Sequence, residues 1–192
     1  LQHRGPDEDG FFFQGPIGLG MRRLRVVDLE GGRQPMGNED GAIQVVFNGE
    51  IYNHHELREK LIARGHRLTT QSDTEVIAHL YEDEGLDCFS FLEGMFAIAI
   101  WDGYKQELVL ARDRLGKKPL FYAQTSHGFS FSSEMTSLLC DKSINRSINY
   151  EAVDEYLSYL FVPHPRTIFK GVCKLPPGAR ALYRAGELSI ER

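Results

Sequence analysis

The sequence predicts an α+β fold in which antiparallel sheets are stacked between layers of helix. Three observations support this prediction. Short strands follow one another as hairpins, the strand at 95–101 is apolar on both faces, and two amphipathic helices are inserted between the strands. Because a strand without a polar face must be covered on both sides, we expect a sandwich rather than an open sheet.

Length and composition restrict the class of protein. A chain of 192 residues with 42% hydrophobic and 26% charged residues fits one globular domain with a sizeable core. The net charge of −5 argues against nucleic acid as a partner. The longest apolar run, 95–101, is too short for a membrane span, and no secretory signal opens the chain. The three scattered cysteines, Cys88, Cys140 and Cys173, predict reduced thiols and a cytoplasmic protein.

The first half of the chain is predicted to supply three strands and two helices. Strands are expected at 11–13 and 17–28, and a central strand at 43–47 follows a loop at 30–35 and a turn at 38–41. We expect Asn48-Gly49 to end the central strand, since both residues tolerate positive φ. Helices are predicted over 54–64 and 73–84, because Asn53 with Glu56 and Ser72 with Glu75 resemble capping boxes.

The second half is predicted to be mainly strand. The apolar strand at 95–101 turns at Asp102-Gly103 and pairs with 107–111, and further strands are expected at 120–124 and 129–132. A helix over 150–160, capped by Asn149, carries apolar residues at helical spacing. A proline-rich tail follows and ends in a short strand near 181–183.

The spacing of histidines, carboxylates and glycines in the sequence supports neither a metal site nor a phosphate site. The histidines at 3, 54, 55, 66, 79, 127 and 164 form no H-x-x-x-H pair and show no carboxylate at ligand spacing, so we predict no metal site. Gly116-Lys117 lacks the upstream glycine of a phosphate loop and is interpreted as part of a solvated turn. Arg112-Asp113-Arg114 is predicted to form an architectural ion-pair network.

Three distant segments could together bind a free amino acid. Arg23 could hold a carboxylate through two parallel hydrogen bonds, and Glu50 and Asp73 could hold an ammonium group. The Asn48 amide and the Gly49 N–H are donors of the kind that form an oxyanion hole. Taken singly, an Asn-Gly turn, a surface arginine and a first-turn helix aspartate are the simpler interpretations.

Six motifs in order carry a family resemblance. They are His3-Arg4-Gly5-Pro6-Asp7, Arg23-Leu24-Arg25-Val26-Val27-Asp28, Gln34-Pro35, Asn48-Gly49-Glu50-Ile51-Tyr52-Asn53, Ser72-Asp73-Thr74-Glu75-Val76 and Arg112-Asp113-Arg114-Leu115-Gly116-Lys117-Lys118-Pro119-Leu120. This succession resembles the glutaminase domain of glutamine-hydrolysing asparagine synthetases, a class II glutamine amidotransferase of the N-terminal nucleophile (Ntn) type. The resemblance extends through Leu175-Pro176-Pro177-Gly178. It implies a four-layer αββα sandwich of two antiparallel sheets, of the Ntn-hydrolase type.

The resemblance also implies roles for individual residues. Arg23 would bind the α-carboxylate of L-glutamine, and the backbone around Val26 and Val27 would line the site. Glu50 and Asp73 would hold the α-ammonium group, and Asn48 with Gly49 would form the oxyanion hole. In the family, an N-terminal cysteine attacks the side-chain amide, with its own α-amino group as the base. The ammonia then travels to a synthetase domain, which activates aspartate with ATP and Mg²⁺.

The sequence departs from this pattern at its start, where Leu1 stands instead of the cysteine nucleophile. We therefore expect the chain as given to bind glutamine without hydrolysing it. We interpret 1–192 as a glutamine amidotransferase type-2 domain truncated at both ends, with 161–192 leading toward a synthetase domain of the same chain. That partner domain would carry the ATP and Mg²⁺, no cofactor is expected in this part, and the interpretation is compatible with a homodimer.

Two alternatives stay open. The chain could be a catalytically inactive module of a related synthetase, of the β-lactam synthetase type, or it could serve an amidotransferase with another nitrogen acceptor. A Met-Cys-Gly opening of the full-length protein would favour the enzyme over the module. A sugar-phosphate or phosphoribosyl amidotransferase shares the chemistry of glutamine hydrolysis, but the residues of the His3–Asp7 and Asn48–Asn53 motifs argue against it.

Overall fold

The centre of the structure is a six-stranded antiparallel sheet. The computed structural model describes residues 1–25, 28 and 31–192, and it orders this sheet as β11-β10-β6-β5-β4-β3. The bounds are β3 Met36–Gly37, β4 Ile43–Ile51, β5 Gly94–Asp102, β6 Glu107–Arg112, β10 Arg180–Arg184 and β11 Glu187–Glu191. As predicted, the apolar residues of β5 are buried on both faces of the sheet.

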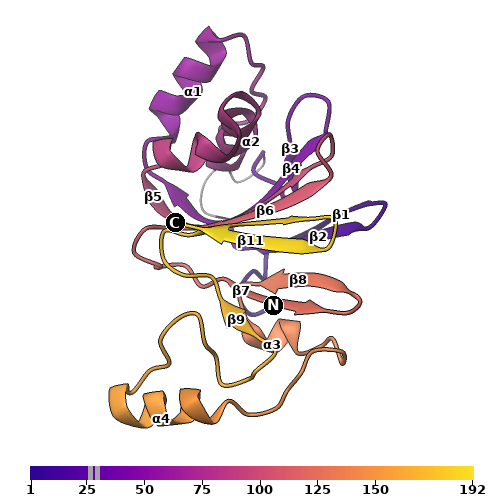
Figure 1. Ribbon diagram of the computed structural model, residues 1–192. Coiled ribbons are helices and arrows are strands. Elements are labelled where there is room, and N and C mark those ends of the chain that lie inside the picture. Colours follow the sequence, from indigo (N-terminus) through magenta and orange to yellow (C-terminus); the bar gives the residue numbers. More distant parts are fainter. Residues whose placement is uncertain (26–27, 29–30) are drawn as a thin grey trace.

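Helices cover one face of this sheet and a second β layer covers the other (Figure 1). Helices α1 (His54–Ala63) and α2 (Asp73–Glu84) pack on the first face, and the 3₁₀ helix η1 (Gly85–Phe91) follows them. The second layer holds β1 (Glu8–Gln14), β2 (Ile17–Arg23), β7 (Phe121–Thr125), β8 (Gly128–Ser132) and β9 (Cys173–Lys174). Beyond it lie α3 (Met135–Leu138) and α4 (Tyr150–Tyr159). This order of layers confirms the predicted αββα sandwich.

The alternation of side chains along β4 explains why the sheet is covered on both faces. Val45 and Phe47 belong to the core under α1 and α2, whereas Val46 belongs to the core that faces the second β layer. Neighbouring strand residues point to opposite faces, so two apolar layers form from one strand. Leu120 and Tyr122 complete the second core. The buried strand thus fixes both layers of the sandwich at once.

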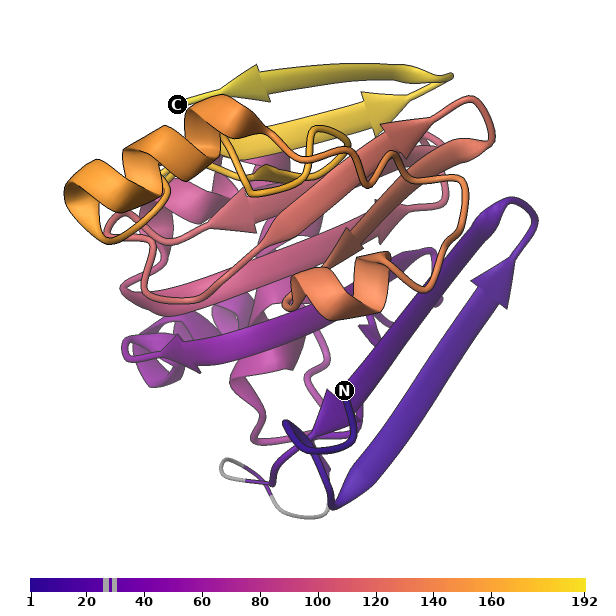
Figure 2. The ribbon, with the colours of Figure 1, turned by 90° about the horizontal axis from the view of Figure 1, so that it is seen from below.

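The second β layer consists of two separate pieces. The β1–β2 hairpin forms one sheet, and β7 lies between β8 and β9 in another. Figure 2 shows the indigo β1–β2 hairpin standing apart from the rest of the layer. Within the described residues, β2 and β8 therefore each keep one edge without a strand partner. We refer to these below as the open edges of β2 and β8.

The central strand is longer than predicted. β4 continues through Asn48 and Gly49 to Ile51, because β5 stays paired with it and places Phe96 opposite Gly49. The prediction that Asn48-Gly49 ends the strand is therefore wrong. Glycine is needed here for close approach, not for a turn, since a Cβ on Gly49 would lie 2.0 Å from the Met95 carbonyl oxygen.

The first predicted capping box does not form. The Asn53 side chain donates to the Phe91 carbonyl at 2.9 Å and accepts from the Glu93 N–H at 3.0 Å, so it joins the start of α1 to the segment before β5. Glu56 instead pairs with Lys60 one turn along the helix, at 2.6 Å. The local pattern predicted the position of the helix correctly but the partner of the amide wrongly.

The second capping box forms in part. α2 spans the predicted residues, and Ser72 Oγ accepts from the Thr74 N–H at 3.2 Å. Glu75 does not close the box. Its buried carboxylate accepts from the N–H and hydroxyl groups of Thr69 and Thr70 at 2.7–2.9 Å, which holds the chain that enters the helix.

The predicted ion-pair network at Arg112-Asp113-Arg114 is wrong. No salt bridge among the described residues involves these three side chains, which bond instead to backbone groups. The Arg112 guanidinium donates to the carbonyls of Gly116, Lys118 and Leu175, each at 2.7 Å. The Asp113 carboxylate accepts from backbone N–H groups of Phe96, Leu115, Lys117 and Lys118. The architectural role therefore rests on hydrogen bonds to the backbone.

Several elements differ from the predicted boundaries or were not predicted. The second strand ends at Arg23 instead of residue 28, and the helix at 150 ends at Tyr159. β3, β9, β11, η1 and α3 were not predicted. The strand near 181–183 proves to be β10, which pairs with β6 and extends the central sheet. In the described part of the chain, no helix combines the length and apolar character that crossing a membrane requires.

Candidate active site

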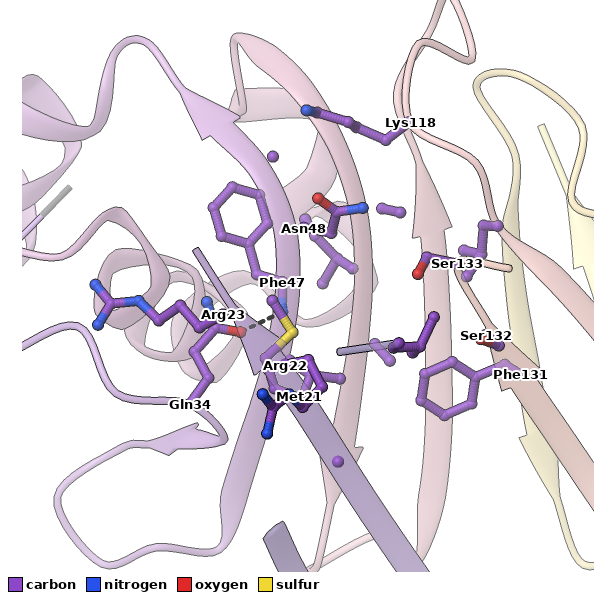
Figure 3. A pocket seen from close by; sticks show the side chains of 18 of the residues that line it. Met21, Arg22, Arg23, Gln34, Phe47, Asn48, Lys118, Phe131, Ser132 and Ser133 are labelled. Carbon is purple, nitrogen blue, oxygen red and sulfur yellow. Dashed lines mark hydrogen bonds between the residues drawn. The ribbon is translucent and has the colours of Figure 1, made fainter. Parts of the chain in front are cut away.

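A cavity of about 690 Å³ lies between β4 and the open edges of β2 and β8 (Figure 3). Five of the seven residues predicted to form the site line it: Arg23, Asn48, Gly49, Glu50 and Asp73. They come from the end of β2, from β4 and from the first residue of α2. Segments far apart in the sequence thus meet at one concave surface.

The other two predicted residues, Val26 and Val27, lie outside the described residues. Their neighbours in the sequence can be placed, since Leu24 and Gly32 both line the cavity. Asp28 lies between them, and its carboxylate accepts from the N–H groups of Gly31 and Gln71, each at 2.8 Å. Asp28 therefore ties this loop to the segment that leads into α2.

Arg23 supplies a guanidinium group to the cavity wall. Arg23 is 6% exposed, and it donates to Glu8 Oε2 at 3.2 Å and to the Asp28 carbonyl at 2.7 Å. Glu8 is also paired with Arg25 at 3.6 Å and with Arg33 at 3.9 Å. A guanidinium on the cavity wall can bind a further carboxylate, because it carries five N–H donors.

Two acids, Asp73 and Glu50, also line the cavity. Asp73 is 5% exposed, and its Oδ2 accepts from the Ile51 N–H at 3.2 Å. Burial raises the pKa of Asp73, although the Ile51 N–H and the nearby His54 counteract part of that rise. Glu50 lies on β4 and is half-buried. A carboxylate held in a desolvated position gains most from a cationic partner.

The raised pKa of Asp73 leads to a prediction about stability. In the native state Asp73 holds its proton to a higher pH than in the unfolded chain, so a cost to stability appears as pH rises above the ordinary value of about 4. Asp73→Asn keeps an acceptor for Ile51 and removes the buried charge. We expect its melting temperature at pH 7 to rise by roughly 2–4 °C, which corresponds to a gain of about 1 kcal/mol in the free energy of unfolding for a chain of this size.

Thermal unfolding of the wild type and Asp73→Asn between pH 4 and pH 7 measures this effect. The difference should shrink toward the acid end, as protonation of Asp73 increases in both states. Asp154→Asn, at an exposed position on α4, is the matched control and should leave the melting temperature unchanged. A variant less stable than the wild type at pH 7 would show that the ionised carboxylate stabilises the fold.

Asn48 lines the same cavity. Its side chain projects from β4, and Figure 3 draws it around the same space as Phe131, Ser132 and Ser133. Within the described part of the chain, the Asn48 amide has no hydrogen-bond partner, so its donors are available to a ligand. Gly49 follows on the same cavity wall. This pair is chemically suited to hold a developing negative charge on oxygen.

Two residues of the cavity were missed as site residues. Gln34 is 6% exposed, and its Oε1 accepts from the Phe47 N–H at 2.7 Å (Figure 3) while its Nε2 donates to Thr74 Oγ1 at 3.1 Å. It joins the loop after Arg23 to β4 and α2, and the Gln34-Pro35 motif was its only signal. Lys118 follows Gly116-Lys117 in the segment that was interpreted as a solvated turn, yet it lines the cavity.

The chain shares its fold with solved structures of an amidotransferase and of a class II aminotransferase domain protein. The solved structure of glutamine phosphoribosylpyrophosphate amidotransferase from B. subtilis matches with a TM-score of 0.65 at 20% identity, covering 91% of this chain and 34% of that one. A class II glutamine aminotransferase domain protein from Silicibacter pomeroyi matches with a TM-score of 0.53 at 13% identity, covering 95% of this chain and 89% of that one. At these identities the likeness establishes the fold alone.

Sequence comparison establishes the family. The chain belongs to the glutamine amidotransferase domain family, whose family model matches residues 1–192. It is 43% identical to asparagine synthetase [glutamine-hydrolyzing] 1 of Bacillus subtilis, covering 96% of this chain and 29% of that protein. It is 41% identical to putative asparagine synthetase [glutamine-hydrolyzing] 2 of Methanocaldococcus jannaschii, covering 100% of this chain and 41% of that protein. The chain thus spans less than half the length of these relatives.

Proposed function

We propose that this chain is the glutaminase domain of a glutamine-hydrolysing asparagine synthetase, which binds L-glutamine and releases ammonia for the amidation of aspartate. The observation that carries the proposal is the cavity, whose lining combines Arg23, the acids Glu50 and Asp73, and the Asn48 amide, which has no partner among the described residues. Such an arrangement complements a free amino acid, whose α-carboxylate and α-ammonium carry opposite charges. The names of relatives at 36–44% identity support asparagine synthesis over the two alternatives.

The proposed roles follow the polarity of the cavity. Arg23 binds the α-carboxylate, and the backbone around Val26 and Val27 is proposed to contact the same substrate. Glu50 and Asp73 bind the α-ammonium group. The side-chain amide of glutamine then points to Asn48 and Gly49, which stabilise the oxyanion formed when a nucleophile attacks.

The nucleophile is proposed to be a cysteine in a strand that precedes Leu1 in the full-length protein. The open edges of β2 and β8 support this placement, because both border the cavity and could pair with an added strand. Leu1 also lies on the cavity wall, so residues before it would start beside the site. The cysteine Sγ attacks the amide carbon, the α-amino group takes the thiol proton, and ammonia leaves.

The partner of this domain is proposed to be a synthetase domain of the same polypeptide, which would hold ATP and Mg²⁺. Helix α4 supports a docking role. Of its predicted apolar face only Ala152 is buried, whereas Tyr156, Leu157 and Leu160 are 52–79% exposed. An exposed apolar helix face is typical of a surface that another domain covers. The whole protein is proposed to be cytoplasmic, since its cysteines are free within the described residues.

Replacing Arg23 with alanine in the full-length protein tests the glutamine clamp. We expect the glutamine KM to rise roughly 10- to 100-fold, because a charge-assisted bond to the substrate is lost. Asparagine synthesis from free ammonia should be unchanged, since it does not need the glutaminase site. Steady-state kinetics with each nitrogen source measures both values.

The control for this experiment is Arg184→Ala, which removes an exposed arginine from β10, away from the cavity. It should leave both activities unchanged. If Arg23→Ala lowered the two activities equally, Arg23 would be assigned to the stability of the fold instead of to glutamine. If the wild type used ammonia but never glutamine, the inactive-module alternative would replace our proposal.

A further inference from the structure

Four potential metal ligands from three segments converge on the side of α2. Glu39 lies in the turn between β3 and β4, His66 follows α1, and His79 and Glu82 are three residues apart on α2. One ligand atom of each lies within 4.8 Å of the other three, and none of the four residues lines the 690 Å³ cavity. We propose that these four side chains form a binding site for a divalent transition-metal ion, with Zn²⁺ as the best match.

The distances between the ligand atoms are close to those of a tetrahedral site. His66 Nδ1 lies 3.1 Å from His79 Nδ1, and His79 Nδ1 lies 3.3 Å from Glu39 Oε2 and 3.9 Å from Glu82 Oε2. In a tetrahedral zinc site with bonds of about 2.0–2.1 Å, neighbouring ligand atoms are roughly 3.3–3.4 Å apart. Only small side-chain movements are needed to bring the four atoms around one ion.

A count of protons shows why a cation is favoured here. His66 Nε2 lies 3.0 Å from Asp83 Oδ1, so a neutral His66 carries its proton on Nε2 and presents a lone pair at Nδ1. The carboxylates of Glu39 and Glu82 are acceptors only. His79 Nδ1 can supply a single proton to these three acceptors, and His79 is 1% exposed. A metal ion would satisfy all four lone pairs together.

Outer contacts orient the ligands. A metal-binding histidine usually donates its second N–H to a carboxylate or carbonyl, as His66 does toward Asp83. The two acidic ligands are held by Asn38 Nδ2, which donates to Glu82 Oε2 at 3.3 Å, and by the Arg67 N–H, which donates to Glu39 Oε1 at 2.9 Å. The site is therefore positioned before any ion binds.

The ligand set selects the kind of ion. Two imidazoles and two carboxylates suit Zn²⁺ and related first-row ions, whereas Mg²⁺ and Ca²⁺ favour oxygen ligands throughout. The two carboxylates also balance the charge of a divalent ion. By joining the β3–β4 turn and the chain after α1 to α2, the ion would stabilise the helix that begins with Asp73.

The sequence prediction of no metal site considered only local spacing, which does not bring these four residues together. His79 and Glu82, one helical turn apart, are the single local signal. The other two ligands come from distant segments, and only the packing of α1, α2 and the β3–β4 turn brings them together.

Isothermal titration of the metal-free protein with Zn²⁺ tests the proposal. We expect one ion to bind per chain, and the melting temperature to rise by roughly 5–10 °C at a hundredfold excess of Zn²⁺ over Kd. Co²⁺ in place of Zn²⁺ should give the visible absorption bands of a tetrahedral nitrogen and oxygen site. These readouts are independent of any glutaminase or synthetase activity.

Because His79 is buried, the variants are made at the exposed ligands. Glu39→Gln and Glu82→Gln should each weaken Zn²⁺ binding tenfold or more without changing the melting temperature of the metal-free protein. Glu84→Gln, near the same end of α2 but outside the cluster, and His127→Gln are controls that should bind as the wild type does. Failure to bind millimolar Zn²⁺, or binding that both ligand variants leave unchanged, would overturn the proposal.

Discussion

Replacing Asn48 with alanine is expected to lower the turnover of glutamine hydrolysis in the full-length protein roughly 100- to 1,000-fold. The Asn48 amide is available on the cavity wall, and its N–H group would meet the glutamine carbonyl oxygen only as negative charge develops there. A bond that strengthens in the transition state affects kcat more than the affinity for substrate. The glutamine KM should therefore change little.

The measurement compares glutaminase kinetics of the wild type and Asn48→Ala, with ammonia-dependent synthesis as the internal reference. Asn145→Ala, at an exposed position near α4, is the control for an amide outside the cavity. Turnover at the wild-type level would remove Asn48 from the oxyanion role. A large rise in KM with unchanged kcat would assign it to substrate binding instead.

Replacing Asp113 with alanine is expected to have the largest effect on stability, a loss of more than about 4 kcal/mol. Asp113 is 2% exposed, and its carboxylate accepts four backbone N–H groups at 2.9–3.3 Å. Without it, the Phe96 N–H would be buried with no acceptor, and the part-buried N–H groups of Leu115, Lys117 and Lys118 would lose theirs. The loop that follows β6 would keep only backbone hydrogen bonds to β5, and Lys118 would lose its place at the cavity.

Chemical denaturation of the wild type and Asp113→Ala measures this loss, and Asp141→Ala is the matched control. Asp141 also accepts a backbone N–H, from Ser143 at 2.8 Å, but it is exposed, so its loss should cost little. A loss of less than about 1 kcal/mol for Asp113→Ala would show that water replaces the carboxylate without cost.

The contribution of Asp113 should also depend on pH. Burial acts to raise its pKa, but the backbone N–H groups outweigh burial and hold the pKa of Asp113 below its ordinary value. The stabilisation is therefore present above the unfolded-state value of about 4 and is lost as pH falls through the lower native value. The gap in stability between wild type and Asp113→Ala should narrow in acid.

Local patterns predicted the elements whose signals are local. α2 was placed residue for residue, because Ser72 caps it and Gly85, with a φ of 56°, ends it. The apolar run of β5 correctly indicated a strand covered on both faces. These features depend on neighbours within a few residues, which a sequence displays directly.

Features that depend on distant partners could not be predicted from local patterns. Asn48-Gly49 looks like a turn until β5 is known to pair with it. In the sequence Arg112 resembles one partner of an ion pair, but in the structure its guanidinium donates to the distant Leu175 carbonyl. The six motifs in order predicted the five site residues that line the cavity. The place of Gln34 became apparent only from its hydrogen bonds to Phe47 and Thr74.

The split second layer has a consequence for the behaviour of the chain on its own. Within the described residues the open edges of β2 and β8 have no strand partner, and on β1 the exposed rings of Phe11 and Phe13 stack with centroids 6.2 Å apart. Unpaired edge strands beside exposed aromatic side chains can pair with a strand of a neighbouring molecule, which is a first step in ordered aggregation. A further strand paired with the open edges of β2 and β8 would prevent one molecule from pairing with the next.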